Sequence, residues 1–438
     1  MSVRLRYVIL GGGLAGLTCA DELLRRGHDA VCVEAQREVG GLARNLVVQD
    51  HIFDIGGHRF HSDNPEIIAW IQDLLGDELL TVERRSRILL AGRFADYPLR
   101  PVNAFFGMGP KKSFEVLAGY LRVAASSRGE TDNFEDWVVS RFGRALYDIY
   151  FGPYTRKVWG IDPRRISATW AAQRIQLLSL AQAVRKAMFP APGGPRTLVS
   201  SFFYPRNGIG RIAIRIAKRS ESRGGRIVTG QAVRGVARDG DGFRVELASG
   251  ETLRGDRVVS TIPIGLAANM LGIDVSAGAL EYRSLRCVQV LLRRPRVTSD
   301  TWIYTPDSDI IFARIHEPKN WSPHLVPGDG TSLCLEVFCT EGDELWNMDG
   351  EELHRRCVND LARLGFIDAG EVTHAADLRV RDAYPVFLVG FEHKLAAVTA
   401  AIRDSGVELV GRTGAFTYKN MDQVIEDSLD LVRRLTEA

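Results

Sequence analysis

The sequence predicts an α/β chain that combines a parallel sheet, an inserted helical segment and an antiparallel sheet. Three patterns indicate this. An apolar run at residues 7–10 leads through a glycine-rich turn into an amphipathic helix and a second apolar strand. Helical periodicity dominates residues 65–200. Alternating strand patterns dominate residues 280–340.

The composition is that of an ordinary globular protein. The chain has 438 residues, of which 45% are hydrophobic and 25% charged, so we expect roughly two or three domains. The formal net charge is +2 and no long basic block is present, so we expect no nucleic-acid partner. No apolar run is long enough to span a bilayer, and the first strand pattern leaves no room for a signal peptide, so we expect no integral membrane segment.

The cysteines predict the compartment rather than a metal site. None of the six forms a C-x-x-C pair or a cysteine–histidine cluster with zinc spacing, so we expect no metal. Cys19 and Cys32 lie in apolar surroundings and are predicted to be small core residues. Such usage is typical of a reducing setting, and the predicted location is the cytoplasm.

Residues 1–34 are predicted to form one βαβ unit. The apolar run 7–10 is a buried strand, Leu14 to Gly27 has apolar residues at helical spacing, and Ala30–Val33 is the second strand. Between the first strand and the helix lies a G-x-G-x-x-G turn, which in this frame is typical of a Rossmann-type dinucleotide site.

Each glycine of the turn has a physical role. Gly11 allows the tight turn, Gly13 lets main-chain N–H groups approach a pyrophosphate, and Gly16 lets the helix pack on the strand. The helix N-terminus then faces the diphosphate. Glu34 closes the second strand, where a carboxylate can accept hydrogen bonds from ribose hydroxyls.

Two further segments favour FAD over NAD as the cofactor. Gly40 and Gly41 permit a second close approach of the main chain, and Arg44 can neutralise phosphate charge. Near the C-terminus, Gly411–Gly414 follows a buried strand and offers more main-chain donors. A site assembled from both ends of the chain suits a long, two-part cofactor.

The rest of the chain alternates between helical and strand patterns. Four stretches of the first half carry helical periodicity: Ile67–Leu75, Lys112–Ala125, Phe134–Phe142 and Trp170–Met188. Pro190–Pro195 interrupts the last of these patterns and is predicted to form a loop. A second βαβ-like stretch is predicted with a helix at Ile212–Lys218 and a strand at 226–228, followed by a hairpin of strands 232–237 and 242–247. Further strands are predicted at 257–261, 288–292, 332–338 and 407–410, and a C-terminal helix at Met421–Leu435.

Motifs along most of the chain carry a family resemblance. Glu34 with Gly40, Gly41 and Arg44 resembles the flavin amine oxidase and protoporphyrinogen oxidase superfamily. Five further segments, in the family's order, resemble motifs of the UDP-galactopyranose mutases: Gly57–Asn64, 134–160, Ala313–Lys319, Ala383–Pro385 and Val410–Asp422.

The resemblance implies a domain organisation and a reaction. A discontinuous Rossmann-type FAD-binding domain would comprise residues 1–65, 205–280 and 385–438. A mostly helical domain at 66–204 and an antiparallel sheet substrate domain at 281–384 would cover the flavin. In the family, N5 of the reduced flavin attacks the anomeric carbon of a UDP-sugar, and the sugar ring opens and recloses in another size without net redox change.

The site residues that follow from the turn and the resemblance fall into three groups. The cofactor group is Gly11, Gly13, Leu14, Ala15, Gly16, Glu34, Ala35, Gly41, Leu42, Ala43, Arg44, Gly57, His58, Val233, Gly411, Arg412, Met421 and Asp422. The substrate group is Tyr154, Trp159, Arg314, Tyr384, Tyr418 and Asn420. The catalytic group is His58, Arg314 and Arg174.

Structural alternatives stay open for several of these residues. Trp159 can be a core residue, Arg314 a surface ion pair, and His58 a turn histidine; Tyr384 and Tyr418 can be half-buried strand residues. The chain also departs from the family. Leu177 stands where the mutases carry a mobile-loop arginine, Asn420 replaces a carboxylate, and four basic residues nearby are candidates to substitute for that arginine: Arg174, Arg185, Lys186 and Arg196.

The sequence therefore predicts an FAD-dependent enzyme that acts on a small molecule, a nucleotide-activated sugar of the UDP-sugar kind, by mutase-like isomerisation. The alternative is an FAD-dependent oxidoreductase of a sugar carbinol or an amine, which would take up hydride at N5. A third reading, a flavoprotein fold kept for binding, is disfavoured by the complete dinucleotide turn. The oligomeric state stays open, a homodimer included.

Overall fold

The computed structural model describes residues 3–90, 92–96, 110–124, 129–174, 201–275 and 280–437. Its first layer is a five-stranded sheet in the order β19-β13-β1-β2-β9, with every neighbouring pair parallel. The strands are β1 (Arg6–Leu10), β2 (Asp29–Val33), β9 (Arg226–Val228), β13 (Arg257–Ser260) and β19 (Val407–Leu409). The α/β fold class with a Rossmann-type sheet is confirmed.

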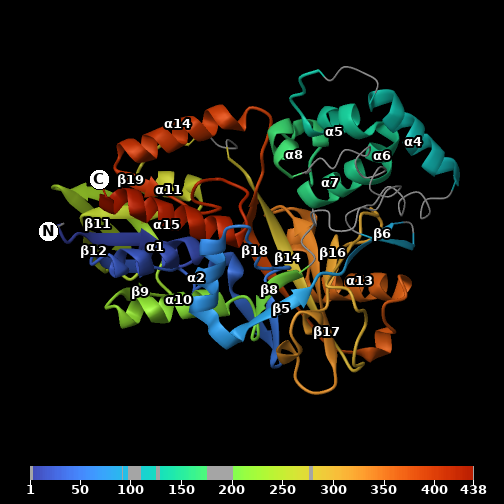
Figure 1. Cartoon of the computed structure of the whole chain (residues 1–438), viewed down its shortest axis with the longest axis horizontal. Helices are drawn as coiled ribbons and strands as arrows, with labels where there is room; N and C mark the ends of the chain where they lie inside the picture. The colour runs from blue at the N-terminus through green and yellow to red at the C-terminus, as the bar shows by residue number, and fades with distance from the viewer. Residues whose placement is uncertain are drawn as a thin grey trace.

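Alternate residues of β1 face two different cores. Tyr7 and Ile9 belong to a core shared with three helices, of which the first packs on both of the others: α1 (Leu14–Arg25), α10 (Arg211–Ser222) and α15 (Met421–Glu437). Val8 and Leu10 belong to the core on the opposite face, which is covered by β10 (Val233–Asp239), β11 (Gly242–Leu247), β12 (Thr252–Gly255), α11 (Ile264–Met270) and α14 (Phe391–Asp404). Figure 1 shows this three-layer unit on the left, with both termini at its outer end.

The second unit is a seven-stranded sheet in the order β18-β14-β17-β16-β15-β6-β7. Its pairs are antiparallel except for the parallel pair of β6 and β15. The strands are β6 (Ser86–Leu90), β7 (Arg93–Asp96), β14 (Tyr282–Leu292), β15 (Trp302–Tyr304), β16 (Arg314–His316), β17 (Thr331–Cys339) and β18 (Val372–Pro385).

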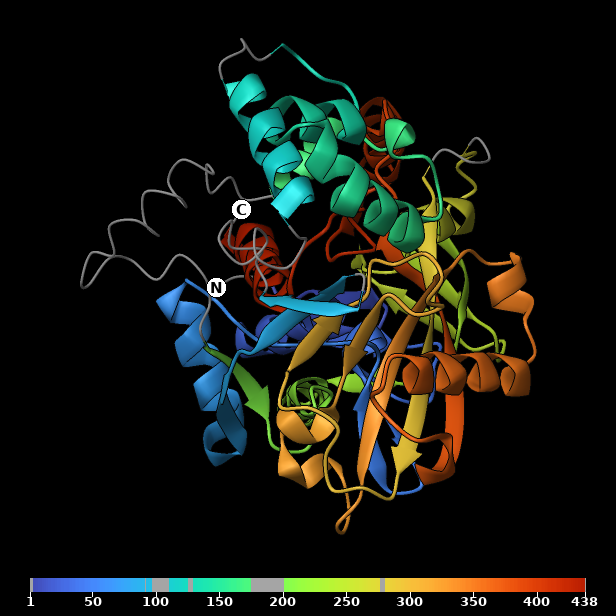
Figure 2. The same ribbon diagram turned by 90° about the vertical axis from the view of Figure 1, so that its right-hand side faces the viewer.

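Helices cover both faces of this sheet. Leu285, Cys287 and Leu291 of β14 face a helical layer made of α4 (Pro110–Ala124), α5 (Phe134–Phe142), α6 (Arg144–Leu146), α7 (Gly152–Trp159) and α8 (Ala168–Arg174). Val288 and Val290 face the other side, where α12 (Glu344–Asn347) and α13 (Gly350–Arg363) pack. In Figure 2 the helical layer lies above the sheet.

The predicted elements are largely confirmed, with one correction. The segment 66–204, expected to be mostly helical, also contains β5 (Leu79–Glu83), which pairs with β8 (Ser201–Pro205), as well as β6 and β7. These strands are only four or five residues long, and β5 and β6 pair with the distant strands β8 and β15, so local periodicity does not reveal them. Residues 175–200, with the expected end of the Trp170 helix and the Pro190 loop, lie outside the described residues. The domain boundaries stay a prediction.

Two composition-based expectations bear on the core and on membranes. All six cysteines are buried free thiols, which confirms the core assignment of Cys19 and Cys32. Among the helices of the described ranges, none has both the length and the apolar character that a bilayer span requires.

Candidate active site

The glycine turn after β1 leaves a helix N-terminus without partners. A Cβ on Gly16 would collide with the Gly11 carbonyl oxygen, so only glycine lets α1 begin this close to the strand. The first four N–H groups of a helix lack intrahelical acceptors. Within the described part of the chain, Gly13 provides no side-chain cap and the first turn of α1 contains no acidic residue. These free donors and the helix dipole favour an external anion.

Gly13 and Gly41 face each other across a narrow slot. A Cβ added to Gly13 would meet only the Gly41 Cα atom, at 3.9 Å, so protein packing does not explain the glycine. A Cβ on Gly41 would lie 3.2 Å from the Gly13 Cα atom. With no side chain on either glycine, a diphosphate can approach the main chain at the rim of the slot, which is what a dinucleotide requires.

Glu34 is fixed by the turn itself. Its buried carboxylate accepts hydrogen bonds of 2.8 Å from the main-chain N–H groups of Gly12 and Gln36. Each carboxylate oxygen can accept a second bond, so a ribose hydroxyl can still bind there. Arg44 donates a 2.8 Å bond to the Gly41 carbonyl, and burial lowers the pKa of its guanidinium.

The C-terminal segment closes the cofactor region from the other side. Gly411 lies against the first turn of α1, because a Cβ on it would be 2.8 Å from the Ala15 Cβ atom. The next residue, Arg412, buries its Nε and Nη2 atoms without an acceptor among the described residues. Asp422 buries Oδ1 in the same way, and burial raises the pKa of this carboxyl. Buried polar atoms without partners are rare, and these fit the edge of a ligand site.

The remaining predicted cofactor residues lie at the ends of the elements that frame this region. Each stands in the first turn of a helix, just after Glu34, in the short helical turn Gly41–Ala43, or at the start of β10 or α15: Leu14, Ala15, Ala35, Leu42, Ala43, Val233 and Met421. The glycine slot, the uncapped helix and the unpartnered Arg412 together fit FAD.

Arg314 on β16 is the centre of the second cluster. Its Nε atom donates to the Tyr154 hydroxyl at 3.0 Å, and Nη1 donates to Glu336 Oε2 at 2.9 Å and to the Tyr384 hydroxyl at 3.3 Å. Burial opposes the charge of Arg314, but Tyr154 and Glu336 raise the pKa of the guanidinium well above its ordinary value. Arg314 is therefore a half-buried, permanently charged group.

Glu336 is a site residue that the sequence analysis missed. It lies directly opposite Arg314 in the β16–β17 register and is fully buried. Its Oε1 atom accepts a 3.0 Å bond from the main-chain N–H of Gly57, while Oε2 binds Arg314. One carboxylate thus connects the Gly57–His58 turn to the charged centre. A glutamate inside the apolar strand pattern 332–338 was the signal that could have identified it.

His58 is a neutral side chain at neutral pH. Burial and the nearby Arg412 lower the pKa of its imidazole to about 4. Its Nδ1 atom lies 3.4 Å from the Gly56 carbonyl. The adjacent Gly57 must be glycine, because a Cβ there would overlap the Trp302 ring.

Aromatic residues join the two clusters. The Tyr384 and Tyr418 rings lie 5.8 Å apart between centroids, and the Arg412 guanidinium is 4.6 Å from the first and 4.4 Å from the second. Trp159 packs edge-on against Tyr384 at 6.3 Å and is only 4% exposed. Arg314, Tyr384 and Tyr418 therefore converge on one place, and the alternative of a surface ion pair for Arg314 is excluded.

A family model described as flavin containing amine oxidoreductase matches residues 14–396. The chain belongs to this family. It is thus an FAD-dependent flavoenzyme, consistent with the residues that line its glycine slot.

Individual relatives of this amine oxidoreductase family member include mutases and oxidases. The probable UDP-galactopyranose mutase of Klebsiella pneumoniae is 25% identical over 169 residues, which cover 37% of this chain and 43% of that protein. The match therefore spans less than half of the curated relative. A crystal structure of reduced UDP-galactopyranose mutase superposes with a TM-score of 0.86 at 22% identity, covering 98% of this chain and 95% of the other. A putative protoporphyrinogen oxidase from Exiguobacterium sp. 255-15 gives a TM-score of 0.79 at 18% identity and full coverage of both chains.

One predicted substrate residue of the flavoenzyme is not brought into the cluster, and several other candidates are residues whose side chains are not described. Asn420 is exposed and precedes α15. Arg174 ends α8, and its side chain is not described. Leu177 and three of the candidate basic residues lie outside the described residues: Arg185, Lys186 and Arg196.

Two cations of the flavoenzyme, the buried Arg283 and the half-buried Lys157, anchor α7, and sequence reasoning missed both roles. Arg283 donates a 2.9 Å bond to the Val158 carbonyl, next to Trp159. Lys157 donates to the carbonyls of Thr305 and Asp307 at 2.7 and 2.8 Å, and burial lowers the pKa of its ammonium to about 7. These bonds fix the helix that carries Tyr154 and Trp159 over the sheet.

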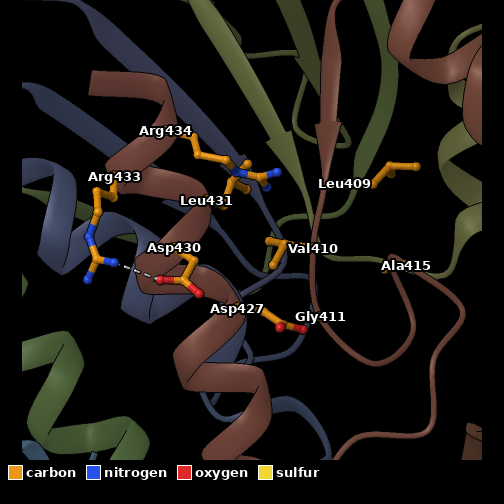
Figure 3. A pocket seen from close by; sticks show the side chains of 9 residues that line it. All are labelled: Leu409, Val410, Gly411, Ala415, Asp427, Asp430, Leu431, Arg433 and Arg434. Atoms are coloured by element: carbon orange, nitrogen blue, oxygen red, sulfur yellow. Dashed lines mark hydrogen bonds and ion pairs between the residues drawn. The ribbon is translucent and has the colours of Figure 1, made fainter. Parts of the chain in front are cut away.

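A separate groove of about 520 Å³ lies between α15 and segment 409–415 (Figure 3). Its charged residues have both signs, and three of the four are paired: Asp430 with Arg433 at 3.1 Å inside the groove, and Asp427 with Lys419, which lies outside its lining, at 2.5 Å. This charge balance gives the groove no preference for an anionic ligand. It adjoins the C-terminal loop and contains none of the residues of the Arg314 cluster.

Proposed function

We propose that this flavoenzyme acts on a nucleotide-activated sugar of the UDP-sugar kind and isomerises it in a mutase-like reaction without net redox change. The observation that carries the proposal is the convergence of Arg314, Arg412, Tyr384 and Tyr418. Two guanidinium groups and two tyrosines meet beside the predicted flavin turn.

The charge of the cluster favours a diphosphate over an amine. Glu336 is the carboxylate in contact with Arg314, and its charge is already neutralised by that guanidinium at 2.9 Å. Arg412 adds a second positive charge with two donors that lack an acceptor among the described residues. Planar guanidinium groups bind phosphate oxygens in bidentate fashion, whereas a protonated amine would be repelled here.

The aromatic residues suit the nucleoside part of such a substrate. Tyr154 stacks on Tyr150 with ring centroids 5.8 Å apart, and Trp159 packs edge-on to Trp170 at 5.0 Å. Tyr154 is half-buried, and an aromatic ring beside a cationic centre can stack a base whose diphosphate binds Arg314. We therefore assign α7 to nucleotide recognition and Arg314 to the diphosphate.

When bound, the reduced flavin supplies a nucleophilic N5 for the anomeric carbon, and the chain's own residues orient the substrate. Arg314 and Tyr384 bind the leaving diphosphate. Glu336 contacts both Arg314 and the N–H of Gly57, and it thereby fixes the position of Arg314 relative to the adjacent His58. Neutral His58 can donate or accept one hydrogen bond without adding charge near the flavin.

Anaerobic turnover of UDP-galactopyranose tests the proposal, with the enzyme compared in dithionite-reduced and oxidised form. Formation of the five-membered-ring isomer by the reduced enzyme alone, with an unchanged flavin spectrum, is expected. The proposal is overturned if no UDP-sugar reacts and an amine bleaches the oxidised flavin.

An FAD-dependent oxidoreductase of an amine or sugar carbinol is the second candidate. It is favoured by the description of the family and by the fold similarity to a putative protoporphyrinogen oxidase. A sugar nucleotide that bleaches oxidised flavin in the same experiment would select the carbinol form of this candidate.

A further inference from the structure

Arg412 lies in the notch between two aromatic rings of the proposed substrate site. Its guanidinium carbon is 4.6 Å from the Tyr384 centroid and 4.4 Å from the Tyr418 centroid, and the rings are 5.8 Å apart. A cation at these distances is attracted to both ring faces. The Tyr384 hydroxyl in turn accepts a 3.3 Å bond from Arg314. Arg412 thus supports the ring whose hydroxyl contacts the other arginine.

The same side chain has unused donors. Its Nε and Nη2 atoms are buried and have no acceptor among the described residues. A buried N–H without an acceptor is destabilising, so the arrangement requires a ligand oxygen. The preceding residue, Gly411, lies against Ala15 in the first turn of α1, where the cofactor diphosphate is expected.

Resting on the proposed function, we propose that Arg412 is a positioning residue that couples cofactor binding to the formation of the nucleotide site. Its free donors bind an anionic oxygen of FAD, and its guanidinium plane holds Tyr384 and Tyr418 for the nucleoside diphosphate. The coupling is reciprocal, since a cofactor that strengthens nucleotide binding must itself be bound more tightly when the nucleotide is present.

The choice of arginine has a specific reason. A planar guanidinium can direct N–H groups outward in its plane while its faces lie against aromatic rings. A lysine ammonium keeps the charge but has neither the plane nor the fork. We therefore expect Arg412→Lys to retain FAD in part and to lose most of the coupling.

The test measures the rate of FAD release from holoenzyme with and without saturating UDP, followed by the recovery of flavin fluorescence. In the wild type we expect UDP to slow release about tenfold, within the usual range of coupling between two sites. In Arg412→Met and Arg412→Lys we expect the ratio to fall to within about twofold of unity, while UDP still binds through Arg314. Arg403→Met, which changes an exposed arginine of α14, is the matched control and retains the wild-type ratio.

The outcomes separate the two proposals. If UDP binds the wild type and leaves FAD release unchanged, the two sites are not coupled; if both Arg412 variants keep a tenfold ratio, Arg412 does not carry the coupling. Either result overturns the inference about Arg412 and leaves the proposed function standing. If UDP does not bind the wild-type holoenzyme at all, the proposed function fails, and the coupling fails with it.

Discussion

Replacing Glu336 by glutamine tests whether the buried carboxylate sets the geometry of Arg314. Glutamine keeps the shape but can accept at only one of its two terminal atoms, so either Arg314 or the Gly57 N–H loses its acceptor. A hydrogen bond to a charged group contributes about 1.5–3 kcal/mol. The Arg314 side chain is 15% exposed, so water offsets part of the loss. We expect the misplaced Arg314 to make the free energy of UDP binding less favourable by about 1–2 kcal/mol, which corresponds to about 5–30-fold in the dissociation constant.

The assay is calorimetric titration of UDP into Glu336→Gln holoenzyme, together with its FAD content. We expect the Kd of UDP to rise by about 5–30-fold, with FAD retained. The matched control is Glu341→Gln, which removes the charge from an exposed pair with Arg381 and changes the Kd by less than about twofold. Wild-type affinity for UDP in Glu336→Gln would refute the role of this carboxylate.

Four other substitutions give distinct results. The Gly13→Ala variant is expected to melt like the wild-type apoprotein yet to lose FAD, because its new Cβ enters only the slot. The Gly16→Ala variant is expected to have a lower melting temperature even without FAD, because its new Cβ collides with the Gly11 carbonyl oxygen. The pKa of His58 is about 4 in the folded protein and about 6.5 in the unfolded chain, so the free energy of unfolding falls as the pH drops from 6.5 to 4. In denaturant melts at several pH values, His58→Gln should show a smaller fall. Trp159→Phe is expected to weaken UDP binding more than FAD retention in parallel titrations, and equal losses would make Trp159 a purely structural residue.

Local patterns were sufficient to predict the cofactor turn. The strand, the glycine spacing and the helix 14–25 are contiguous, and their chemistry depends on main-chain geometry. The helix Phe134–Phe142 was likewise predictable, because Asn133 caps it and Gly143 ends it. Such features are encoded within one short contiguous stretch of the chain.

The rest depends on long-range pairing that periodicity does not encode. Arg314 meets Glu336 because β16 and β17 pair in one particular register, and a shift by one residue would turn both side chains to the other face. The contact of Glu336 with Gly57 joins segments 279 residues apart. Strand β6 joins the large sheet through β15, which also lies far along the chain. The family resemblance placed Arg314, Tyr384 and Tyr418 but did not indicate their buried carboxylate.

In the proposed function, a nucleoside diphosphate binds at Arg314, beside the flavin. Titrating UDP into oxidised wild-type and Arg314→Lys holoenzyme, while recording heat and the flavin absorption spectrum, tests it most directly. We predict one UDP per chain with a change in the flavin spectrum, and a loss of both in the variant at unchanged FAD content. Binding of UDP that is equally strong in Arg314→Lys, or that leaves the flavin spectrum untouched, would contradict the account.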